Sequence, residues 1–575
     1  MCQLSKKLIP AFLLVSSILS HVNAELFTAL ADMEELLETE SVLISNLENF
    51  IIAQEEKVDF LRRKVSEYKR EHNEAATDVS SYLSNPVNAY LLTKRLTVDW
   101  REIESVMTFD VGSAFVANIT RYREVLKFPG DEDLNGAAVA LMRLQDTYNL
   151  DTHKVAQGEL NGVKYSTEMS ANDCFELGRQ SYMNHDYYHT ILWMEESLRK
   201  LENESNRTID RSDILEYLAF STFKQGDTHL ALTMTNELLE LIPDHERARG
   251  NKAYYEKELQ LQASKSQLRG DDGSDAVPKA KEEMILPYSK ADNSIYTTNE
   301  RKLYEMGCRG ELSPSPKELA KLKCRYVFNI TAFLRIAPLK LEEANLKPYI
   351  VIYHDVMYDS EMEIIKSMAK PRFRRATVQN HLTGELEVAH YRISKSAWLK
   401  DEDHEIIRTI SHRLHDMTGL NMDTAEELQV VNYGIGGHYE PHFDFARREE
   451  TNSFKSLGTG NRIATVLFYM TDVPQGGATV FPHLRLSLWP KKGTAAFWFN
   501  LFADGEGDYL TRVSYMFKYF KKFNLFLYLN STQHVLFWQA QNGVISNRWI
   551  HERGQEFLRP CLLQPDSPTE EHLKV

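Results

Sequence analysis

The sequence predicts a multidomain protein whose N-terminal half is α-helical and whose C-terminal domain is an all-β barrel or jelly roll. Three observations lead to this prediction: an apolar heptad pattern over 25–70, paired-helix patterns from about 170 to 262, and β-rich apolar runs from about 346 to 560. The chain has 575 residues, which is too long for a single hydrophobic core. We therefore expect three or four domains.

The composition is that of a soluble globular protein, with 43% hydrophobic and 26% charged residues. The formal net charge is −15 at pH 7. Because nucleic acids and anionic membranes repel such a chain, we expect neither as a partner.

The N-terminus has the features of a secretory signal peptide. Lys6 and Lys7 precede an apolar run over 9–19, and Val22-Asn23-Ala24 places small residues before a cut at position 25. The alternative is a membrane anchor, but this run is too short to cross a bilayer, and we predict no other membrane span. Residues 1–24 are therefore predicted to be a signal peptide.

Secretion permits disulfide bonds. Cys308 and Cys324 are close in sequence within a loop-like region, and we predict that they form a disulfide. The lumenal route also agrees with five Asn-X-Ser/Thr triplets that could carry glycans. They begin at Asn118, Asn203, Asn206, Asn329 and Asn530.

Residues 25–70 form a long helical pattern with heptad spacing. One apolar row is Leu30, Leu37, Ile44, Ile51, Val58 and Val65, and the companion row is Leu26, Met33, Leu47, Leu61 and Tyr68. Alternating steps of three and four residues are typical of a coiled-coil seam. We predict a helical dimerisation domain over 25–165; the alternative is an amphipathic helix that packs on its own domain.

Residues 166–262 are predicted to form a small tetratricopeptide-like module. In the stretch 215–243, Gly226 turns the chain between two helices, Ala231 lets them approach, and Pro243 ends the second helix. Residues 174–201 look like a second, weaker copy.

Tyrosines are frequent in this module. Aromatic faces grip the polyproline II conformation, so these side chains could form a groove for an extended proline-rich peptide. The alternative is that they fill the helical core. The candidates for peptide binding are Tyr182, Tyr187, Tyr188 and Tyr254.

Residues 263–295 are polar and contain Gly-Asp-Asp-Gly-Ser, which predicts a linker. With the predicted disulfide, this connecting region extends over 263–345. Strands are expected from 346 to 560, the clearest at 429–433, 463–470 and 494–499, and residues 561–575 form a tail.

The sharpest chemical signal is Tyr-Glu-Pro-His-Phe-Asp at 439–444. Residues two apart on a strand face the same side, so His442 and Asp444 can bind one metal ion. One imidazole, one carboxylate and a second, distant histidine form the facial triad of non-haem iron(II) oxygenases, which leaves positions open for 2-oxoglutarate and O₂.

The motifs around this site resemble those of the collagen prolyl 4-hydroxylase alpha-subunit family. The resemblance covers essentially all of 25–512 and resumes near Ser546. The motifs that carry it are Leu141–Asp151, Tyr187–Thr190, Tyr391–Trp398, Tyr433, Gly436–Gly437, Gly458–Arg462, Gly476–Pro482, Pro490–Gly493 and His551–Phe557.

The resemblance implies a catalytic double-stranded β-helix over 346–560, dimerising N-terminal helices and a peptide-binding tetratricopeptide-like domain. It implies an α₂β₂ tetramer in the endoplasmic reticulum lumen, with protein disulfide isomerase as the β subunit. The implied reaction is C4 hydroxylation of proline in X-Pro-Gly repeats of procollagen, with Fe²⁺, 2-oxoglutarate, O₂ and L-ascorbate. Tyr433 is implied to hydrogen-bond 2-oxoglutarate, and Trp549 to line the same pocket.

The chain departs from the family after Arg512. The family has Thr-Arg-His, where the histidine is the second iron ligand, whereas this chain has Thr-Arg-Val513, and the next histidine is His534. We interpret 513–533 as a translated, retained intron, whose removal would join Arg512 to His534; the alternative is a genuine insertion loop. His534 is accordingly the candidate second iron histidine.

A second departure concerns the family's lysine that pairs with the C5 carboxylate of 2-oxoglutarate, ten residues after that histidine. Position 544 is Val, and the nearest base is Arg548, which becomes the candidate anchor. The predicted function is therefore prolyl 4-hydroxylation of procollagen-like chains. The alternatives are an impaired subunit that binds proline-rich peptides without turnover, and a hydroxylase of non-collagen secreted proteins.

Overall fold

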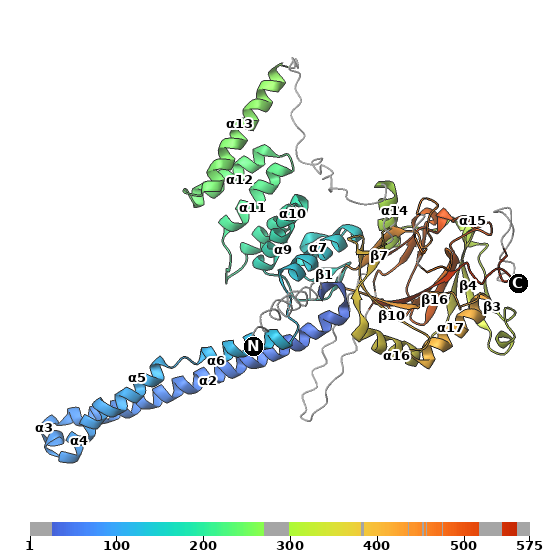
Figure 1. Ribbon diagram of the computed structural model, residues 1–575. Coiled ribbons are helices and arrows are strands. Elements are labelled where there is room, and N and C mark those ends of the chain that lie inside the picture. The colour runs from blue at the N-terminus through green and yellow to red at the C-terminus, as the bar shows by residue number, and fades with distance from the viewer. Residues whose placement is uncertain are drawn as a thin grey trace, which may run out of the picture. The chain divides into compact units, whose positions relative to one another are not determined.

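The computed structural model describes residues 26–268, 298–380, 385–434, 436–450, 453–455, 457–473, 475–516 and 543–560 (Figure 1). The predicted signal peptide, residues 269–297 of the predicted linker, His534 and the predicted tail lie outside these ranges. The chain divides into two compact units, residues 32–130 and the remainder. None of the described helices is long and apolar enough to cross a membrane.

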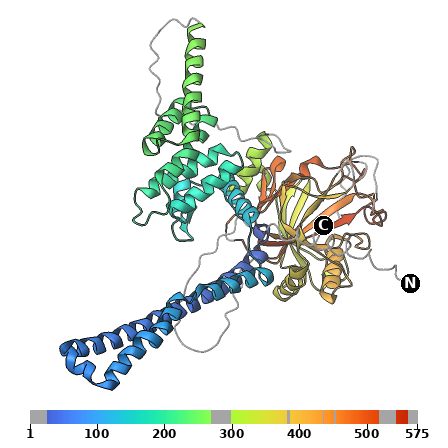
Figure 2. The same ribbon diagram turned by 60° about the vertical axis from the view of Figure 1, so that its left-hand side comes forward.

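Residues 32–130 form an elongated helical unit. The 48-residue helix α2 (Leu30–Thr77) leads to two short helices, α3 (Val79–Ser84) and α4 (Pro86–Lys94), and α5 (Trp100–Thr108) and α6 (Gly112–Val125) return alongside α2 (Figures 1 and 2). A π-helical turn, η3 (Arg95–Asp99), joins α4 to α5.

Two ring contacts hold the returning helices against α2. Phe50 meets Phe115 edge-on with ring centroids 5.6 Å apart, and Tyr68 lies 5.9 Å from Trp100. One side of α2 is thus packed within its own unit, as expected for the alternative of an amphipathic helix that packs on its own domain.

A second side of α2 remains open. Five members of the first heptad row are between 41% and 64% exposed. They are Leu37, Ile44, Ile51, Val58 and Val65. An apolar row of this length on a described surface is available for association with another chain.

The predicted tetratricopeptide-like module is a series of paired helices: α9 (Ala171–Met183), α10 (Tyr187–Leu201), α11 (Arg211–Lys224), α12 (Thr228–Leu241) and α13 (Glu246–Leu268). Gly226 turns the chain between α11 and α12 with a φ of +98°, and Ala231 is fully buried, as predicted. Helices α7 (Asp131–Tyr148) and α8 (Thr152–Ala156) and the small hairpin β1 (Glu159–Leu160) and β2 (Val163–Lys164) precede the module.

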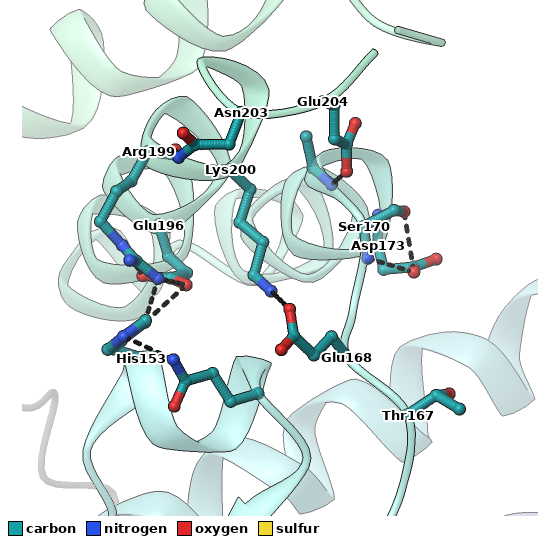
Figure 3. Close-up of polar contacts among 12 residues, drawn as sticks. His153, Thr167, Glu168, Ser170, Asp173, Glu196, Arg199, Lys200, Asn203 and Glu204 are labelled. Atoms are coloured by element: carbon teal, nitrogen blue, oxygen red, sulfur yellow. Dashed lines mark hydrogen bonds and ion pairs between the residues drawn. The ribbon is translucent and has the colours of Figure 1, made fainter. Parts of the chain in front are cut away.

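Polar contacts fix the first helical pair (Figure 3). Ser170 and Asp173 form a reciprocal capping box at the start of α9, which satisfies backbone amides that the helix itself leaves unpaired. Lys200 on α10 reaches Glu168 at 3.3 Å, and the Glu204 carboxylate accepts the Ala171 amide at 2.6 Å. The turn after α10 is thereby tied to the start of α9.

The C-terminal domain is a pair of facing antiparallel sheets, as expected for a double-stranded β-helix. The larger has nine strands in the order β3-β4-β5-β16-β13-β18-β11-β10-β6, and the smaller has five in the order β15-β14-β17-β12-β9. The bounds of the larger sheet are β3 (Cys324–Val327), β4 (Leu339–Leu346), β5 (Tyr349–His354), β16 (Thr494–Phe499), β13 (Arg462–Tyr469), β18 (Gly543–His551), β11 (Leu428–Tyr433), β10 (Lys395–Leu399) and β6 (Arg374–Arg375).

The smaller sheet comprises β15 (Leu486–Leu488), β14 (Thr479–Phe481), β17 (Val513–Met516), β12 (His438–His442) and β9 (Arg392–Ile393), and a separate hairpin joins β7 (Thr377–Gln379) to β8 (Leu386–Val388). The three clearest strands of the sequence correspond to β11, β13 and β16.

Three apolar clusters define the layers of this domain. Helices α16 (Asp359–Ala369) and α17 (Glu405–Thr418) cover the outer face of the larger sheet. Helices α7 and α14 (Thr298–Arg309) pack on the outer face of the smaller sheet. The third cluster lies between the sheets and includes Tyr433, Val513 and Ile545. The alternation along each strand therefore decides which residues enter the interior.

The predicted Cys308–Cys324 disulfide is not formed. Both cysteines are free thiols, and they occupy different surroundings: Cys308 on α14 is buried in the cluster with Val480, whereas Cys324 is exposed at the start of the edge strand β3. The prediction rested on sequence proximity within a loop-like region, whereas a disulfide also requires the two Cβ atoms to face each other.

Candidate active site

His442 and Asp444 converge at one end of the inter-sheet space, as the sequence predicted. His442 is the last residue of β12, and its Nε2 lies 3.5 Å from the Asp444 Oδ1. Ligand atoms that share one octahedral ion at about 2.1 Å lie about 3 Å apart, so this pair is close to a chelating geometry. Asp444 is 4% exposed.

The hydrogen bonds of His442 select the tautomer that a metal ligand needs. Its Nδ1 lies 2.7 Å from the Glu440 carbonyl oxygen, which can only accept, so Nδ1 carries the hydrogen. Nε2, which the carbonyl leaves free, therefore faces Asp444. A backbone carbonyl that orients a ligating histidine in this way is the common arrangement in metal sites.

A chain of hydroxyl and amide groups orients the carboxylate. Thr465 donates from Oγ1 to the Asp444 Oδ2 at 2.8 Å, and Asn500 donates from Nδ2 to the Thr465 oxygen at 2.9 Å. Burial by itself would raise the pKa of Asp444, but the neighbouring His442, Arg462 and Thr465 outweigh it and lower the pKa. The carboxylate is thus charged and held in position for a cation.

A bulge in β12 aims two side chains at the same space. Between Tyr439 and His442 the register with β17 shifts, because three residue steps on β12 pair with two on β17. Both rings consequently face inward and stack, with centroids 3.4 Å apart and planes 17° apart. Pro441, which lacks an amide hydrogen, lies inside this bulge.

The position directly opposite His442 on the neighbouring strand is Val513. Its side chain is fully buried in the inter-sheet cluster with Tyr433 and Ile545. Residues opposite each other on adjacent antiparallel strands have Cβ atoms about 4.5–5.5 Å apart, which is the spacing at which a third ligand could join His442 and Asp444.

The described residues therefore bring together two of the three side chains that a facial triad would need. In this part of the chain, no three His, Cys, Asp or Glu side chains are placed to hold a metal ion. A valine cannot coordinate iron, so position 513 does not fit the iron that the family uses. His534, the candidate second histidine, lies outside the described residues and stays a prediction.

Tyr433 and Trp549 both lie on the inner face of the larger sheet. Tyr433 is 3% exposed at the end of β11, and burial raises its pKa. On β18, Gly543 pairs with Tyr433. Trp549 follows six residues later and pairs with Thr465, the residue that donates to Asp444. Their shared role towards 2-oxoglutarate stays a prediction, and they flank different parts of the inner face.

Val544, the position that the sequence spacing indicated for the carboxylate anchor, does not belong to the inter-sheet cluster. Val544 belongs to the outer cluster under α16 and α17, whereas its neighbour Ile545 belongs to the inner cluster with Tyr433. Gly543 pairs directly with Tyr433, and directly paired residues share a face. The position that faces Tyr433 is therefore 543.

Arg548 is not an anchor for a ligand in the inner space, and that prediction is wrong. It pairs with Val466 of the outer cluster, and its guanidinium lies 3.2 Å from Asp401 Oδ1. It lines a cavity with His412 and His415 on the outer side of the sheet. The strand alternation, which a one-residue difference reverses, is the physical reason.

An ion-pair network beside Asp444 was not found from the sequence. Arg462 donates to both oxygens of Glu426 at 2.6 and 3.0 Å, and His551 Nε2 lies 2.9 Å from the Glu426 Oε1. The Arg462 guanidinium lies 3.9 Å from the Trp549 ring and donates to the Asp444 carbonyl oxygen at 3.3 Å. Arg462 and His551 do lie inside motifs that carried the family resemblance, but their pairing needs the folded sheet.

Two of the candidate peptide-binding tyrosines, Tyr182 and Tyr187, lie in one aromatic cluster. Tyr182 and Tyr187 meet Tyr217 and Phe220, with Tyr182 5.0 Å from the Tyr217 centroid and 5.9 Å from that of Tyr187. Tyr217 and Phe220 were not among the predicted residues. A pocket beside this cluster is also lined by Glu216, Arg247 and Asn251.

Tyr254 is 55% exposed and packs edge-on against Phe223. The ring of Tyr188 contacts that of His189 on α10. Phe223 in turn lies 6.5 Å from Phe220, so Tyr254 extends the Tyr182 cluster through Phe223.

Comparison with known proteins defines the class first. Residues 428–505, which include His442 and Asp444, match the model of the 2OG-Fe(II) oxygenase superfamily. The C-terminal domain is thus an oxygenase of the class that uses Fe(II) and 2-oxoglutarate. Residues 29–162 match the prolyl 4-hydroxylase alpha-subunit N-terminal region, and residues 171–261 match the prolyl 4-hydroxylase peptide-substrate-binding domain.

Whole-length relatives then define the family. Prolyl 4-hydroxylase subunit alpha-1 of Homo sapiens is 46% identical over 539 residues, which are 93% of this chain and 95% of the relative. Subunit alpha-2 of Caenorhabditis elegans is 45% identical over 97% of each chain. A viral collagen prolyl hydroxylase from Paramecium bursaria Chlorella virus-1, a solved structure, is 19% identical over 35% of this chain and 94% of its own, with a TM-score of 0.25. The chain belongs to the prolyl 4-hydroxylase alpha-subunit family, and the predicted fold class is confirmed.

Proposed function

We propose that this chain hydroxylates proline at C4 in X-Pro-Gly sequences of procollagen-like chains. The hydroxylation is coupled to oxidative decarboxylation of 2-oxoglutarate to succinate. The observation that carries the proposal is the pair of His442 and Asp444, 3.5 Å apart, in a chain that matches the family over nearly its whole length. Iron with 2-oxoglutarate and O₂ supplies the oxidising chemistry in this class, and the protein supplies position and shielding.

This chain's own residues prepare the cation site. The Glu440 carbonyl fixes the histidine tautomer, and the Asn500–Thr465 relay fixes the carboxylate. A cleft of about 540 Å³ is lined by Phe445, which follows Asp444 in the chain, and by Arg447 and Tyr509, and we propose it as a path for the peptide.

The helical module supports a peptide substrate. Its half-buried cluster of Tyr182, Tyr187, Tyr217 and Phe220 presents aromatic edges and faces, which suit the pre-formed polyproline II helix of a proline-rich chain. The match of 171–261 to the peptide-substrate-binding domain agrees with this role.

We further propose assembly and location from the same family membership. The exposed heptad row on α2 is the surface for self-association, and protein disulfide isomerase is the β subunit of an α₂β₂ tetramer. The predicted signal peptide supports the endoplasmic reticulum lumen as the location. L-ascorbate is proposed as the reductant that keeps the iron in its Fe²⁺ state.

The test is succinate release by the full chain co-expressed with protein disulfide isomerase. We expect release from 2-oxoglutarate that depends on a Pro-Pro-Gly repeat peptide and is lost with Asp444→Ala. A repeat peptide with alanine in place of the hydroxylated proline is the matched substrate control. Absence of peptide-dependent succinate at saturating Fe²⁺ and 2-oxoglutarate would remove the proposal.

A second candidate function has a specific observation in its favour. Val513 at the position opposite His442 favours a subunit that binds proline-rich chains without turnover. Peptide binding measured by fluorescence anisotropy, together with the succinate assay, separates the two functions. Binding without succinate release supports this second candidate.

A further inference from the structure

We propose that position 513 is the vacant ligand position of the metal site, so that the described part of the chain lacks a complete iron triad by one side chain. The inference rests on the proposed function, because it concerns the same site. It predicts that a ligating side chain introduced at 513 creates tight metal binding in an otherwise complete cradle.

The pairing register between β12 and β17 places position 513 next to the site. Val513 is the direct partner of His442 on the adjacent strand, and Tyr515, the next inward residue of β17, pairs with Tyr439. The ring of Tyr515 is 6.1 Å from that of His442 and 48° from parallel. Val513 is therefore the inward residue of β17 that lies directly opposite His442 in the register, and Tyr515 adds a ring to the same space.

Strand β17 is regularly paired and buried. Ser514 donates to the Val480 carbonyl oxygen at 3.3 Å, and the four residues of β17 are between 0% and 3% exposed. Strand β17 is paired with β12 on one side and with β14 on the other. The backbone that should present a third ligand is thus in place, and only the side chain differs.

His442 and Asp444 are held in position by other residues. The His442 tautomer is set by Glu440, and Asp444 is held by Thr465, without any contribution from position 513. The two-ligand half of the site is therefore organised independently. A third donor completes it without further rearrangement of these groups.

The test measures Fe²⁺ binding to the full chain by anaerobic equilibrium dialysis, so activity is not the readout. We expect Val513→His to strengthen binding of one Fe²⁺ per chain by at least about tenfold, since even outer partners of metal ligands change affinity roughly 10- to 100-fold. Val513→Cys is the second variant, because a thiol is close to valine in size and fits a buried site that a larger imidazole could strain.

Two controls make the assignment specific to this position. Met516→His places the same ligand on the same strand but on its outer face, in the cluster under α7 and α14, and is expected to leave Fe²⁺ affinity within twofold of the parent chain. Adding His442→Ala to Val513→His is expected to abolish the gain. Circular dichroism verifies that each variant is folded.

The outcomes separate this inference from the proposed function. If the parent chain already binds one Fe²⁺ tightly, and neither Val513→His nor Val513→Cys strengthens it, the inference is overturned; loss of that binding with His534→Ala would then identify the third ligand. If Val513→His binds Fe²⁺ and still releases no succinate with the repeat peptide, the inference stands and the proposed function fails.

Discussion

The Glu426–Arg462–His551 network is predicted to be a main stabilising element beneath the active site. The Glu426 carboxylate is largely buried and accepts from Nε and Nη2 on one edge of the Arg462 guanidinium. Burial alone would raise the pKa of Glu426, but Arg462 and His551 outweigh it and lower the pKa from 4.5 to about 2. We expect Glu426→Gln to remove this stabilisation and to leave Arg462 buried without its counter-charge.

The magnitude follows from the pKa difference. The change from 4.5 to about 2 corresponds, at about 1.4 kcal/mol per unit, to about 3 kcal/mol of folding stability at pH 7. This agrees with the roughly 3–5 kcal/mol lost when one partner of a buried ion pair is removed.

The pH dependence has a definite sign. A carboxyl group whose pKa is lower in the folded protein stabilises the fold fully above its unfolded value of 4.5, and this contribution disappears as the pH falls through about 2. The deficit of Glu426→Gln should therefore be complete at pH 7 and less than half as large at pH 3.

Hydrogen exchange read by mass spectrometry on peptides of β13 and β18 is the assay, because it reports local opening free energies in a multidomain chain. Glu427→Gln is the matched control, since that neighbouring carboxylate is 42% exposed and meets Lys400 at 3.6 Å. Unchanged protection in Glu426→Gln at pH 7, or a deficit that is equal at pH 7 and pH 3, would refute the reasoning.

Three further predictions follow from other parts of the chain. Burial lowers the pKa of His189, but Asp146 and Asp186 outweigh it and raise the pKa to about 9. The contribution of the protonated His189 to folding stability is therefore complete below pH 6.5 and is lost as the pH rises through 9. Asp146→Asn should then lower the thermal midpoint at pH 7 but not at pH 10, with the exposed Glu202→Gln as the control. An equal loss at both pH values contradicts this. Substituting Ile44 and Ile51 on the open row of α2 with Glu should shift sedimentation to a lower mass, whereas Glu55→Ala should not, and an unchanged mass in the Glu variant excludes that surface. In a Val513→His background, Gly543→Lys should tighten 2-oxoglutarate binding by about tenfold or more, in line with ~1.5–3 kcal/mol for a hydrogen bond to a charged group. Val544→Lys should instead destabilise the outer core. Calorimetric titration in which Val544→Lys binds 2-oxoglutarate more tightly than Gly543→Lys would disprove the assigned register.

The sequence determined the class and layout of this protein because its signals are local. Periodicity distinguished the helical half from the β half. Gly226 and Pro243 marked helix ends because the residue type alone favours a turn or a helix stop. The His442–Asp444 pair was predictable because two ligands that are two residues apart need only one strand end to bring them together.

The tertiary structure decided everything that depends on register between distant segments. It placed Val513 opposite His442 and Gly543 opposite Tyr433, and it turned Arg548 to the outer side of the sheet. Counting residues along the chain could not give these assignments, because a shift of one residue moves a side chain to the opposite face.

The same limit applied to the cysteines and to the aromatic cluster. Cys308 and Cys324 are 16 positions apart in sequence, yet one lies in a core and the other at an exposed edge. Tyr217 and Phe220 join Tyr182 because helices α9 and α11 pack together, a contact that no local pattern contains. Residue type and spacing thus specified which chemistry this chain carries, and the pairing of its strands and helices decided which side chains share one space.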